Sequence, residues 1–447
     1  MELLIKLSQF LLSLSLLIIL HELGHFIPAK LFKTRVEKFY LFFDIKFSLL
    51  KKKIGETEYG IGWLPLGGYV KIAGMIDESM DKEQMALPPQ PWEFRSKPAW
   101  QRLIIMLGGV TVNFVLAFII YIGMAFVYGD TYLNNSELKD GIAVTSSVGE
   151  ELGFKTGDKI ISIDGEKATK FDEIPGKILF AKNVVLERNG EVQTLNLPVD
   201  LIDKLLKGEK RPFIDWREPF LIGKVPDSSK NKAVLLAKDR IVSINETDTK
   251  YADMAINVLK SNKGKTVDAV IIRDEKEMKV ALQISKDGKL GVFQGGMSIS
   301  SLEKLGLYKF SKQKYSFLEA FPAGIEKGVD QIVGYGKQLK AIFSPKTGAY
   351  KGVGGFKAIF DIFPASWSWE LFWSITAILS IMLGVMNLLP IPALDGGHVL
   401  FLLFEMISGK KPSEKFLENA QMVGIVLLIT LVVFANGNDI YKAIMGK

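Results

Sequence analysis

The chain is 447 residues long, carries a formal net charge of +7, and contains 23% charged and 48% hydrophobic residues. A chain of this size can hold several domains, and a positive mean hydropathy beside so many charges predicts a few membrane spans joined to soluble modules rather than a transporter with many spans. The absence of cysteine excludes a thiol nucleophile, a disulfide framework and a thiolate metal site.

Residues 1–28 are expected to form the first membrane-spanning helix, because residues 3–27 are apolar until the motif His21-Glu22-Leu23-Gly24-His25. Lys6 before an apolar stretch is also typical of a cleavable secretion signal, but such a signal ends in small residues near its cleavage site. We therefore expect the segment to be retained. Ionisable groups inside a span cost roughly 2.5–3.5 kcal/mol each, so they usually mark a function.

Residues 29–98 are expected to form a cytoplasmic loop that contains a β-hairpin. Between Gly60 and Gly74, aromatic and β-branched residues are punctuated by glycines, which predicts strands joined by a tight turn. The segment is apolar for a solvated loop, and non-helical backbone at membrane depth is tolerated where protein covers it or where it lines a cavity. We expect a hairpin that dips into the membrane beside the first span; an ordinary surface loop is the alternative.

Residues 99–128 are expected to form the second span. The run from Leu103 to Tyr128 is interrupted only by Asn113 and small residues, and it exceeds the roughly 20 residues that a helix needs to cross a bilayer. Basic residues precede this run, and such clusters collect on the cytoplasmic side of a membrane.

The segment after the second span contains an internal repeat. Residues 157–165 (GDKIISIDG) and 238–246 (KDRIVSINE) align residue for residue, and an alternating stretch typical of a strand follows each of them. This duplication predicts two copies of one small β-rich module, which we assign to residues 129–218 and 219–300. Both copies resemble PDZ domains, which can bind a peptide by adding a strand to a sheet edge. Neither copy has a convincing carboxylate-binding loop, so a steric or scaffolding role is an equal alternative.

Residues 301–370 are expected to form an amphipathic segment on the same side as the modules. Apolar residues recur at helical spacing between Phe317 and Phe343, which predicts a helix at the membrane surface or against the module pair. Trp367, Trp369 and Trp373 suit a headgroup boundary at the entry to the next span.

Residues 371–398 are expected to form the third span together with a motif at its end. The apolar run from Leu371 to Leu389 leads into the sequence NLLPIPALDGGH, which covers residues 387–398. Its two prolines interrupt the helix and its two glycines let the backbone turn, so Asp395 or His398 can point back among the spans.

Residues 399–419 are expected to form a second cytoplasmic loop, and residues 420–447 the fourth span and the C-terminus. The apolar run 420–435 is short, so a buried helix of a soluble domain is the alternative. With four spans, the basic clusters fall on one side, which we take as the cytoplasm. Both termini and residues 129–370 then lie on the other side. The clusters contain Lys30, Lys33, Arg35, Lys38, Arg95, Lys97, Arg102, Lys410, Lys411 and Lys415.

The motif in the first span predicts a zinc site. On a helix, His21 and His25 lie one turn apart on the same face, where two imidazoles can bind one zinc ion. Zinc lowers the pKa of a bound water to about 7, and Glu22 can accept its proton and pass it to the leaving amine. A third protein ligand is required, and the residues alone do not rank Asp395 over His398. A plain helix-ending turn capped by Asp395 is the alternative.

Together these motifs resemble the site-2 protease family of intramembrane zinc metalloproteases. HELGH in the first span, the glycine-rich residues 65–70, the tandem PDZ-like repeat and NLLPIPALDGGH carry this resemblance, which extends over nearly the whole chain. The arrangement is similar to the bacterial tandem-PDZ branch, the regulators of sigma-E. The expected fold is therefore a polytopic α-helical membrane protein with four transmembrane helices, a membrane-dipping β-hairpin and two extracytoplasmic PDZ-like α+β domains.

The resemblance also implies roles for individual residues. Asp395 is the implied third zinc ligand, Asn387 is implied to hold substrate near the metal, and His398 is left with a supporting role. A substrate helix must unwind locally before its peptide bond can be attacked, and strand pairing with the hairpin can stabilise the unwound segment. The hairpin residues expected to bind substrate are Leu64, Pro65, Leu66, Gly67, Gly68 and Tyr69.

The expected partners are single-pass membrane proteins and the lipid bilayer, and no nucleic acid. The resemblance implies anti-sigma factors as substrates, after a first cut by another protease, together with remnant signal peptides. It also implies that the PDZ-like pair excludes untrimmed proteins, and that the enzyme resides in the bacterial inner membrane.

Two other classes of protein fit less well. A metal transporter also places histidine and aspartate inside the membrane, but it predicts more spans and ligands spread along a pathway. An inactive membrane scaffold gives no reason for Glu22 to stand between two histidines.

Overall fold

The computed structural model describes residues 1–65, 67–75, 87–209 and 211–444, and the chain divides into two compact units. The first unit, here called the helical unit, consists of residues 1–129, 314–342 and 351–447. The second, here called the module unit, consists of residues 130–313 and 343–350.

Four helices of the helical unit are long and apolar enough to cross a membrane, as predicted; they are α1 (Glu2–Leu31), α3 (Ala99–Val127), α11 (Trp369–Leu388) and α13 (Glu414–Ile444). Two boundaries differ from the sequence prediction. Residues 399–408 of the loop expected at residues 399–419 belong to a helix, α12 (Asp395–Ser408), and α13 starts at Glu414, earlier than expected. The apolar run after the two glycines continues helical spacing, which the prolines before it do not interrupt.

Helix α3 is the central helix of this unit, because it contacts α1, α9, α11 and α12. Its crossing with α1 is a direct contact between two backbones. A Cβ added to Gly108 would lie 1.8 Å from the carbonyl oxygen of Gly24, and a Cβ on Gly24 would lie 2.4 Å from that of Gly108. Small residues allow membrane helices to approach this closely.

Helix α9 (Phe317–Ile342) is the predicted amphipathic helix, and it packs against α3. Small residues form the contact: Ala320, Gly324 and Gly328 are buried, and a Cβ on Gly324 would lie 2.5 Å from the backbone nitrogen of Ile122. The apolar side chains of Phe321 and Ile325 are exposed.

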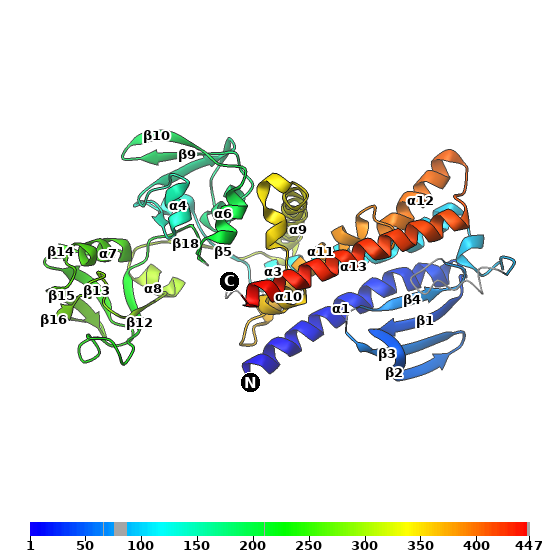
Figure 1. Cartoon of the computed structure of the whole chain (residues 1–447), viewed down its shortest axis with the longest axis horizontal. Helices are drawn as coiled ribbons and strands as arrows, with labels where there is room; N and C mark the ends of the chain where they lie inside the picture. The colour runs from blue at the N-terminus through cyan, green and yellow to red at the C-terminus, as the bar shows by residue number, and fades with distance from the viewer. Residues whose placement is uncertain (66, 76–86, 210, 445–447) are drawn as a thin grey trace. The chain divides into compact units, whose positions relative to one another are not determined.

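A four-stranded sheet lies beside α1 (Figure 1); its strands are β1 (Val36–Leu41), β2 (Phe43–Ile54), β3 (Thr57–Leu64) and β4 (Tyr69–Ile72). The strand order is β2-β3-β1-β4, with β1 parallel to β3 and antiparallel to β4. The predicted hairpin is therefore wrong in its pairing, because β3 and β4 both pair with β1 and not with each other. Local sequence spacing cannot reveal a strand inserted between its neighbours.

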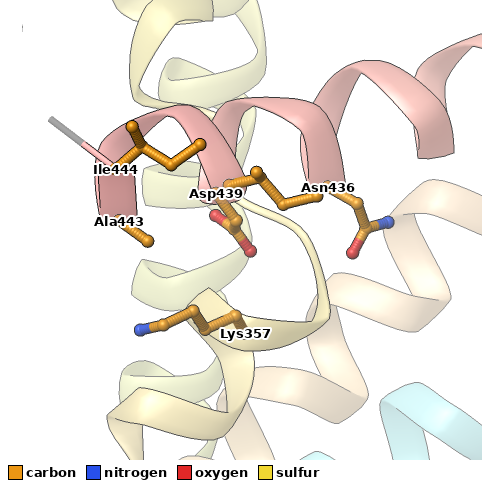
Figure 2. A pocket seen from close by; sticks show the side chains of 6 residues that line it. Lys357, Asn436, Asp439, Ala443 and Ile444 are labelled. Carbon is orange, nitrogen blue, oxygen red and sulfur yellow. The ribbon is translucent and has the colours of Figure 1, made fainter.

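The end of α13 holds the segment that precedes α11. The Asp439 carboxylate accepts hydrogen bonds from the backbone nitrogens of Gly355 (2.9 Å) and Ala358 (3.1 Å), and Asn436 accepts one from Phe356 (3.2 Å). These acceptors satisfy the free amides at the start of α10 (Phe356–Ile362). Figure 2 shows Asn436 and Asp439 on α13 beside this segment and Lys357.

The module unit contains two copies that share four paired strands and one helix, in agreement with the repeat in the sequence. The first copy consists of β6 (Ala143–Val144), α4 (Ser147–Glu151), β7 (Lys159–Ile163), β8 (Glu166–Lys167), α5 (Ile174–Ile178), β9 (Asn183–Arg188), β10 (Glu191–Asn196), α6 (Leu201–Lys207) and β11 (Ile214–Asp215). The second consists of β12 (Phe220–Lys224), β13 (Arg240–Ile244), β14 (Thr247–Asp248), α7 (Ala252–Ser261), β15 (Thr266–Arg273), β16 (Lys276–Gln283) and β17 (Phe293–Gly295). Corresponding strands pair in the same order, β10-β9-β7-β8 in one copy and β16-β15-β13-β14 in the other.

The two copies also share a buried ion pair. The Asp158 carboxylate accepts hydrogen bonds of 2.7 Å from Nε and Nη2 of Arg188, and the Asp239 carboxylate accepts equivalent bonds of 2.7 and 2.6 Å from Arg273. Each aspartate stands at the same position of the repeat, and each arginine ends the corresponding strand, β9 or β15. The duplication therefore extends to individual hydrogen bonds.

The chain returns to the first copy after the second copy ends. Strand β18 (Phe310–Gln313) pairs antiparallel with β5 (Asp130–Leu133), and helix α8 (Ile299–Lys304) brings Leu302 into the core of the first copy. The first part of the segment predicted as one amphipathic stretch, residues 301–370, thus completes a folded module instead.

Candidate metal centre

Helix α1 presents His21 and His25 on one buried face. The helix continues for a further turn beyond the motif, so the spacing of four residues puts the two rings next to each other, with centroids 4.9 Å apart. Their Nε2 atoms are 3.3 Å apart. Both side chains point toward α3, because a Cβ on Gly109 would lie 2.4 Å from Nε2 of His25 and 2.6 Å from Cε1 of His21.

Asp395 reaches the same place from the start of α12. The chain leaves α11 at Leu388 and makes a tight turn in which Ala393 has a φ of 78°. Glycine is required directly after the aspartate, because a Cβ on Gly396 would lie 2.2 Å from the carbonyl oxygen of Leu389. The turn thereby aims the Asp395 carboxylate at the face of α1 that carries the histidines.

The three side chains form a triangle of ligand atoms. Oδ2 of Asp395 lies 3.3 Å from Nε2 of His25 and 3.5 Å from Nε2 of His21. A tetrahedral zinc site with bonds of about 2.0–2.1 Å has ligand atoms about 3.3–3.4 Å apart, so the triangle has the size of one face of such a site. Oδ2 is also buried without a hydrogen bond to any residue that the structure describes. The donor set and its geometry fit a zinc ion.

The tautomer of His25 agrees with this role. Its Nδ1 lies 2.9 Å from the backbone carbonyl oxygen of Ile105. A carbonyl oxygen can only accept, so Nδ1 carries a proton, and the neutral form of the ring has its lone pair on Nε2, directed at the triangle. Histidines that bind metals are commonly oriented by such a bond.

Glu22 lies on the side of α1 that faces the loop between β3 and β4. A Cβ on Gly68 would lie 3.5 Å from Cγ of Glu22 and 2.4 Å from the side chain of Ile18. Because residue 68 is glycine, the backbone of this loop can lie directly over the helix turn that carries Glu22.

Asn387 and His398 occupy different positions relative to the triangle. Nδ2 of Asn387, near the end of α11, lies 3.4 Å from Nε2 of His21. His398 lies further along α12, and it is not part of the group that could hold a metal ion in the described part of the chain, which consists of His21, His25 and Asp395. Between the two candidates that the sequence left open, the fold brings Asp395 to the histidines.

The residues expected to bind substrate lie at the end of β3, in the loop and at the start of β4. Leu64 ends β3, Pro65, Gly67 and Gly68 form the loop, and Tyr69 begins β4; Leu66 lies outside the described residues. Strand β4 pairs with β1 on one side and stands at the end of the sheet order. The hydroxyl of Tyr69 donates a 2.8 Å hydrogen bond to Asp44, which fixes the ring away from this strand's backbone.

One polar residue near the site was not recognised in the sequence analysis. Asn113, in the middle of α3, is completely buried, and its Nδ2 lies 3.0 Å from Nδ1 of His21. A single amide side chain within an otherwise apolar span was the signal that could have identified it, because such a group needs a polar partner inside the membrane.

Comparisons with known proteins relate this chain to metalloproteases. Residues 9–431 match the family model described as Peptidase family M50. The chain is 28% identical to the regulator of sigma E protease of Haemophilus influenzae, over 99% of this chain and 100% of that protein. It is 27% identical to the regulator of sigma-E protease RseP of Escherichia coli, over 97% and 98%. A protein of Campylobacter jejuni that carries a zinc metalloprotease name is 28% identical, over 97% and 92%.

A comparison with solved structures gives a match to a short segment. The PDZ domain of an SdrC-like protein from Listeria monocytogenes is 23% identical, covers 19% of this chain and 92% of its own, and has a TM-score of 0.16. A TM-score of this size does not support an argument about the modules.

Proposed function

Because this chain belongs to peptidase family M50, we propose that it hydrolyses peptide bonds within the transmembrane segments of other membrane proteins. It is a zinc metalloprotease, as are the relatives that carry that name, and we assign His21, His25 and Asp395 as its zinc ligands. The observation that carries the proposal is the triangle of ligand atoms. Two of them lie on α1, a helix long and apolar enough to cross a membrane, and the third lies at the start of α12, after the turn that follows another such helix, α11.

Glu22 is the proposed general base. When bound, zinc acts as a Lewis acid, which lowers the pKa of a water ligand to about 7 and polarises the scissile carbonyl. The Glu22 carboxylate accepts a proton from the attacking water, and the same proton passes to the amide nitrogen, which leaves as an amine when the C–N bond breaks. Its position supports this role, since it follows His21 directly and faces the loop before β4.

Asn387 is proposed to bind the substrate carbonyl group. Its amide lies beside His21, on the helix that leads into the metal-binding turn. An N–H donor at this place can stabilise the negative charge that develops on the carbonyl oxygen as water attacks, which is a common source of rate acceleration in peptide hydrolysis.

The outer edge of β4 is proposed to bind the unwound substrate as an added strand. A transmembrane helix that unwinds loses backbone hydrogen bonds, which are costly to leave unmade in a membrane. The backbone of β4 offers new partners, and Gly68 lets the loop before this strand lie next to the helix turn that carries Glu22.

This strand addition can be tested at Tyr69. Proline at this position removes one backbone donor, so we expect Tyr69→Pro to slow cleavage by about tenfold while the zinc content stays unchanged. Tyr69→Phe is the matched control, because it removes the hydroxyl bond to Asp44 and keeps the backbone N–H. Equal rates for Tyr69→Pro and Tyr69→Phe would contradict strand addition.

The proposed substrates are single-span proteins that another protease has already shortened, including anti-sigma factors, together with remnant signal peptides. The proposed site of action is the bacterial inner membrane, with the basic flanks of the spans in the cytoplasm and the PDZ-like modules on the opposite side. The modules are proposed either to bind a peptide end or to exclude untrimmed proteins.

The central experiment compares the wild-type protein with Glu22→Gln in a cleavage assay on a single-span substrate, beside metal analysis of both. We expect Glu22→Gln to keep zinc and to lose activity by about 10²–10⁴-fold, since it retains the shape of the side chain and removes the base. Undiminished turnover would overturn the assignment of Glu22, and zinc-free wild-type protein with full activity would overturn the proposed function.

A further inference from the structure

Asn113 on α3 and His21 on α1 form a buried contact. Nδ2 of Asn113 and Nδ1 of His21 are 3.0 Å apart, and the asparagine is completely buried. The carbonyl oxygen of Asn113 also accepts a 2.7 Å hydrogen bond from the hydroxyl of Ser380 on α11. The side chain of Asn113 contacts one ring of the metal centre, that of His21.

The protonation of His21 sets the direction of this hydrogen bond. If His21 binds zinc through Nε2, that nitrogen has no proton, and the neutral ring carries its proton on Nδ1. Nδ1 is then a donor, and an amide nitrogen opposite it would place two donors against each other.

Rotation of the Asn113 amide by 180° removes this conflict. The oxygen and nitrogen of an amide side chain have nearly the same shape, so their assignment follows from the hydrogen bonds. Oδ1 of Asn113 is buried, and it has no hydrogen-bond partner among the residues that the structure describes. Rotation places this oxygen at the position where Nδ1 of His21 needs an acceptor.

We propose that Asn113 is a positioning residue of the zinc site, whose Oδ1 accepts the Nδ1–H of His21 and thereby holds the Nε2 lone pair toward Asp395. This inference rests on the proposed role of His21 as a zinc ligand. Ile105 performs the same task for His25 with a backbone carbonyl, which no substitution can remove. Of these two hydrogen bonds to the histidines, only the one from His21 to Asn113 can therefore be tested by mutagenesis.

The test measures zinc affinity of the purified full-length protein by competition with a chelator, and records the absorption spectrum after replacement of zinc by cobalt. Asn113→Leu keeps the size of the side chain and removes the acceptor, so we expect zinc affinity to fall by about 10-fold or more, within the range for partners of metal-binding histidines. Asn113→Asp can accept a hydrogen bond but cannot donate one when ionised, so we expect it to keep the affinity within about threefold and to keep the cobalt spectrum.

Two control variants separate this effect from packing and from the proposed ligand set. Ser380→Ala removes the neighbouring bond to the Asn113 backbone and should leave zinc affinity unchanged. His21→Ala should lose zinc; if it does not, the proposed ligand set is wrong and not merely this inference.

Three results would overturn the inference while His21→Ala still loses zinc. One is wild-type affinity in Asn113→Leu, which would mean that Asn113 only fills space. Another is a loss of zinc affinity of about 10-fold or more in Asn113→Asp, which would mean that Asn113 donates to His21. The third is an altered cobalt spectrum in Asn113→Asp, and both results with Asn113→Asp apply even if Asn113→Leu does not fold.

Discussion

Buried carboxylates have different environments in the two units of this protein. In the module unit, Asp158 and Asp239 are each 1% exposed, and an arginine and a backbone amide bind both of their oxygens. In the helical unit, Asp395 lies beside two imidazoles, and its Oδ2 atom is buried with no hydrogen bond to the described residues. A buried charge with a full set of partners is tolerated in the fold, whereas an incomplete set marks a place that a ligand can complete.

Substitution of Asp395 tests the carboxylate whose hydrogen-bond partners are incomplete, and we expect it to have the largest effect, on zinc affinity. Substitution of a residue that supports a metal ligand lowers metal affinity by about 10- to 100-fold. We expect Asp395→Asn to lower zinc affinity by more than this. We expect Asp395→Asn to destabilise the zinc-free protein less than substitution of an aspartate of the modules does, because Oδ2 of Asp395 accepts no hydrogen bond from the described residues. Chelator competition and unfolding of the zinc-free protein are the two measurements.

The matched control for Asp395→Asn is His398→Asn, one turn along the same helix. We expect His398→Asn to keep zinc. If Asp395→Asn keeps zinc and His398→Asn loses it, the third ligand is His398 and the triangle has another role.

Substitution of Asp158 or Asp239 tests the carboxylates whose oxygens both have hydrogen-bond partners. Alanine leaves Arg188 or Arg273 without its partner, so we expect the module unit to lose about 3–5 kcal/mol of unfolding free energy with no change in zinc affinity. Resistance to proteolysis at increasing urea concentration measures this loss.

A paired replacement provides the control for this effect. In Asp158→Leu combined with Arg188→Met, no charge remains without a partner, and well-packed hydrophobic residues often replace a buried pair at little cost. We expect a smaller loss than for Asp158→Ala alone. A loss in zinc affinity on substitution of Asp158 would remove the distinction between the two kinds of buried carboxylate.

Asp140 provides the smallest effect, because its side chain is 42% exposed. Hydrogen bonds from Lys250 (2.6 Å) and Tyr251 (2.7 Å) lower the pKa of Asp140 below its ordinary value. The lowered pKa means that this contribution is present above the ordinary value near pH 4, and is lost as the pH falls through the lowered one. We expect it to amount to less than about 1 kcal/mol.

Comparison of the wild-type protein with Asp140→Asn, at pH 6 and at pH 3, measures this contribution. The stability difference between the two proteins should shrink at the lower pH. A difference that is the same at both pH values would show that the Asp140 carboxylate contributes no pH-dependent stability.

Local sequence spacing predicted the elements that depend on nearby residues. The four apolar helices, the turn of helix that joins His21 to His25, and the repeat at residues 157 and 238 follow from such spacing. The choice between Asp395 and His398 did not, since it depends on how the turn after α11 directs a side chain toward a helix at the other end of the chain. Asn113 was missed for the same reason, because its partner lies on another helix.

The errors concern pairings between distant segments and one neglected apolar run. Strand β1 enters between β3 and β4, so two strands that follow each other in sequence are not neighbours in the sheet. Strand β18 pairs with β5 across the whole duplicated region, and neither short strand has a pattern of its own. Helix α12 was treated as a loop although its apolar residues have helical spacing.

The β5–β18 pair suggests how the duplicated region could be deleted from this protein. Its register places Asp130 opposite Gln313, so the points where the chain enters and leaves the duplicated region lie about 5 Å apart. The region between them behaves as a cassette inserted into the connection between α3 and α9. A turn of a few residues could replace the cassette and leave the packing of those two helices through Gly324 and Gly328 in place.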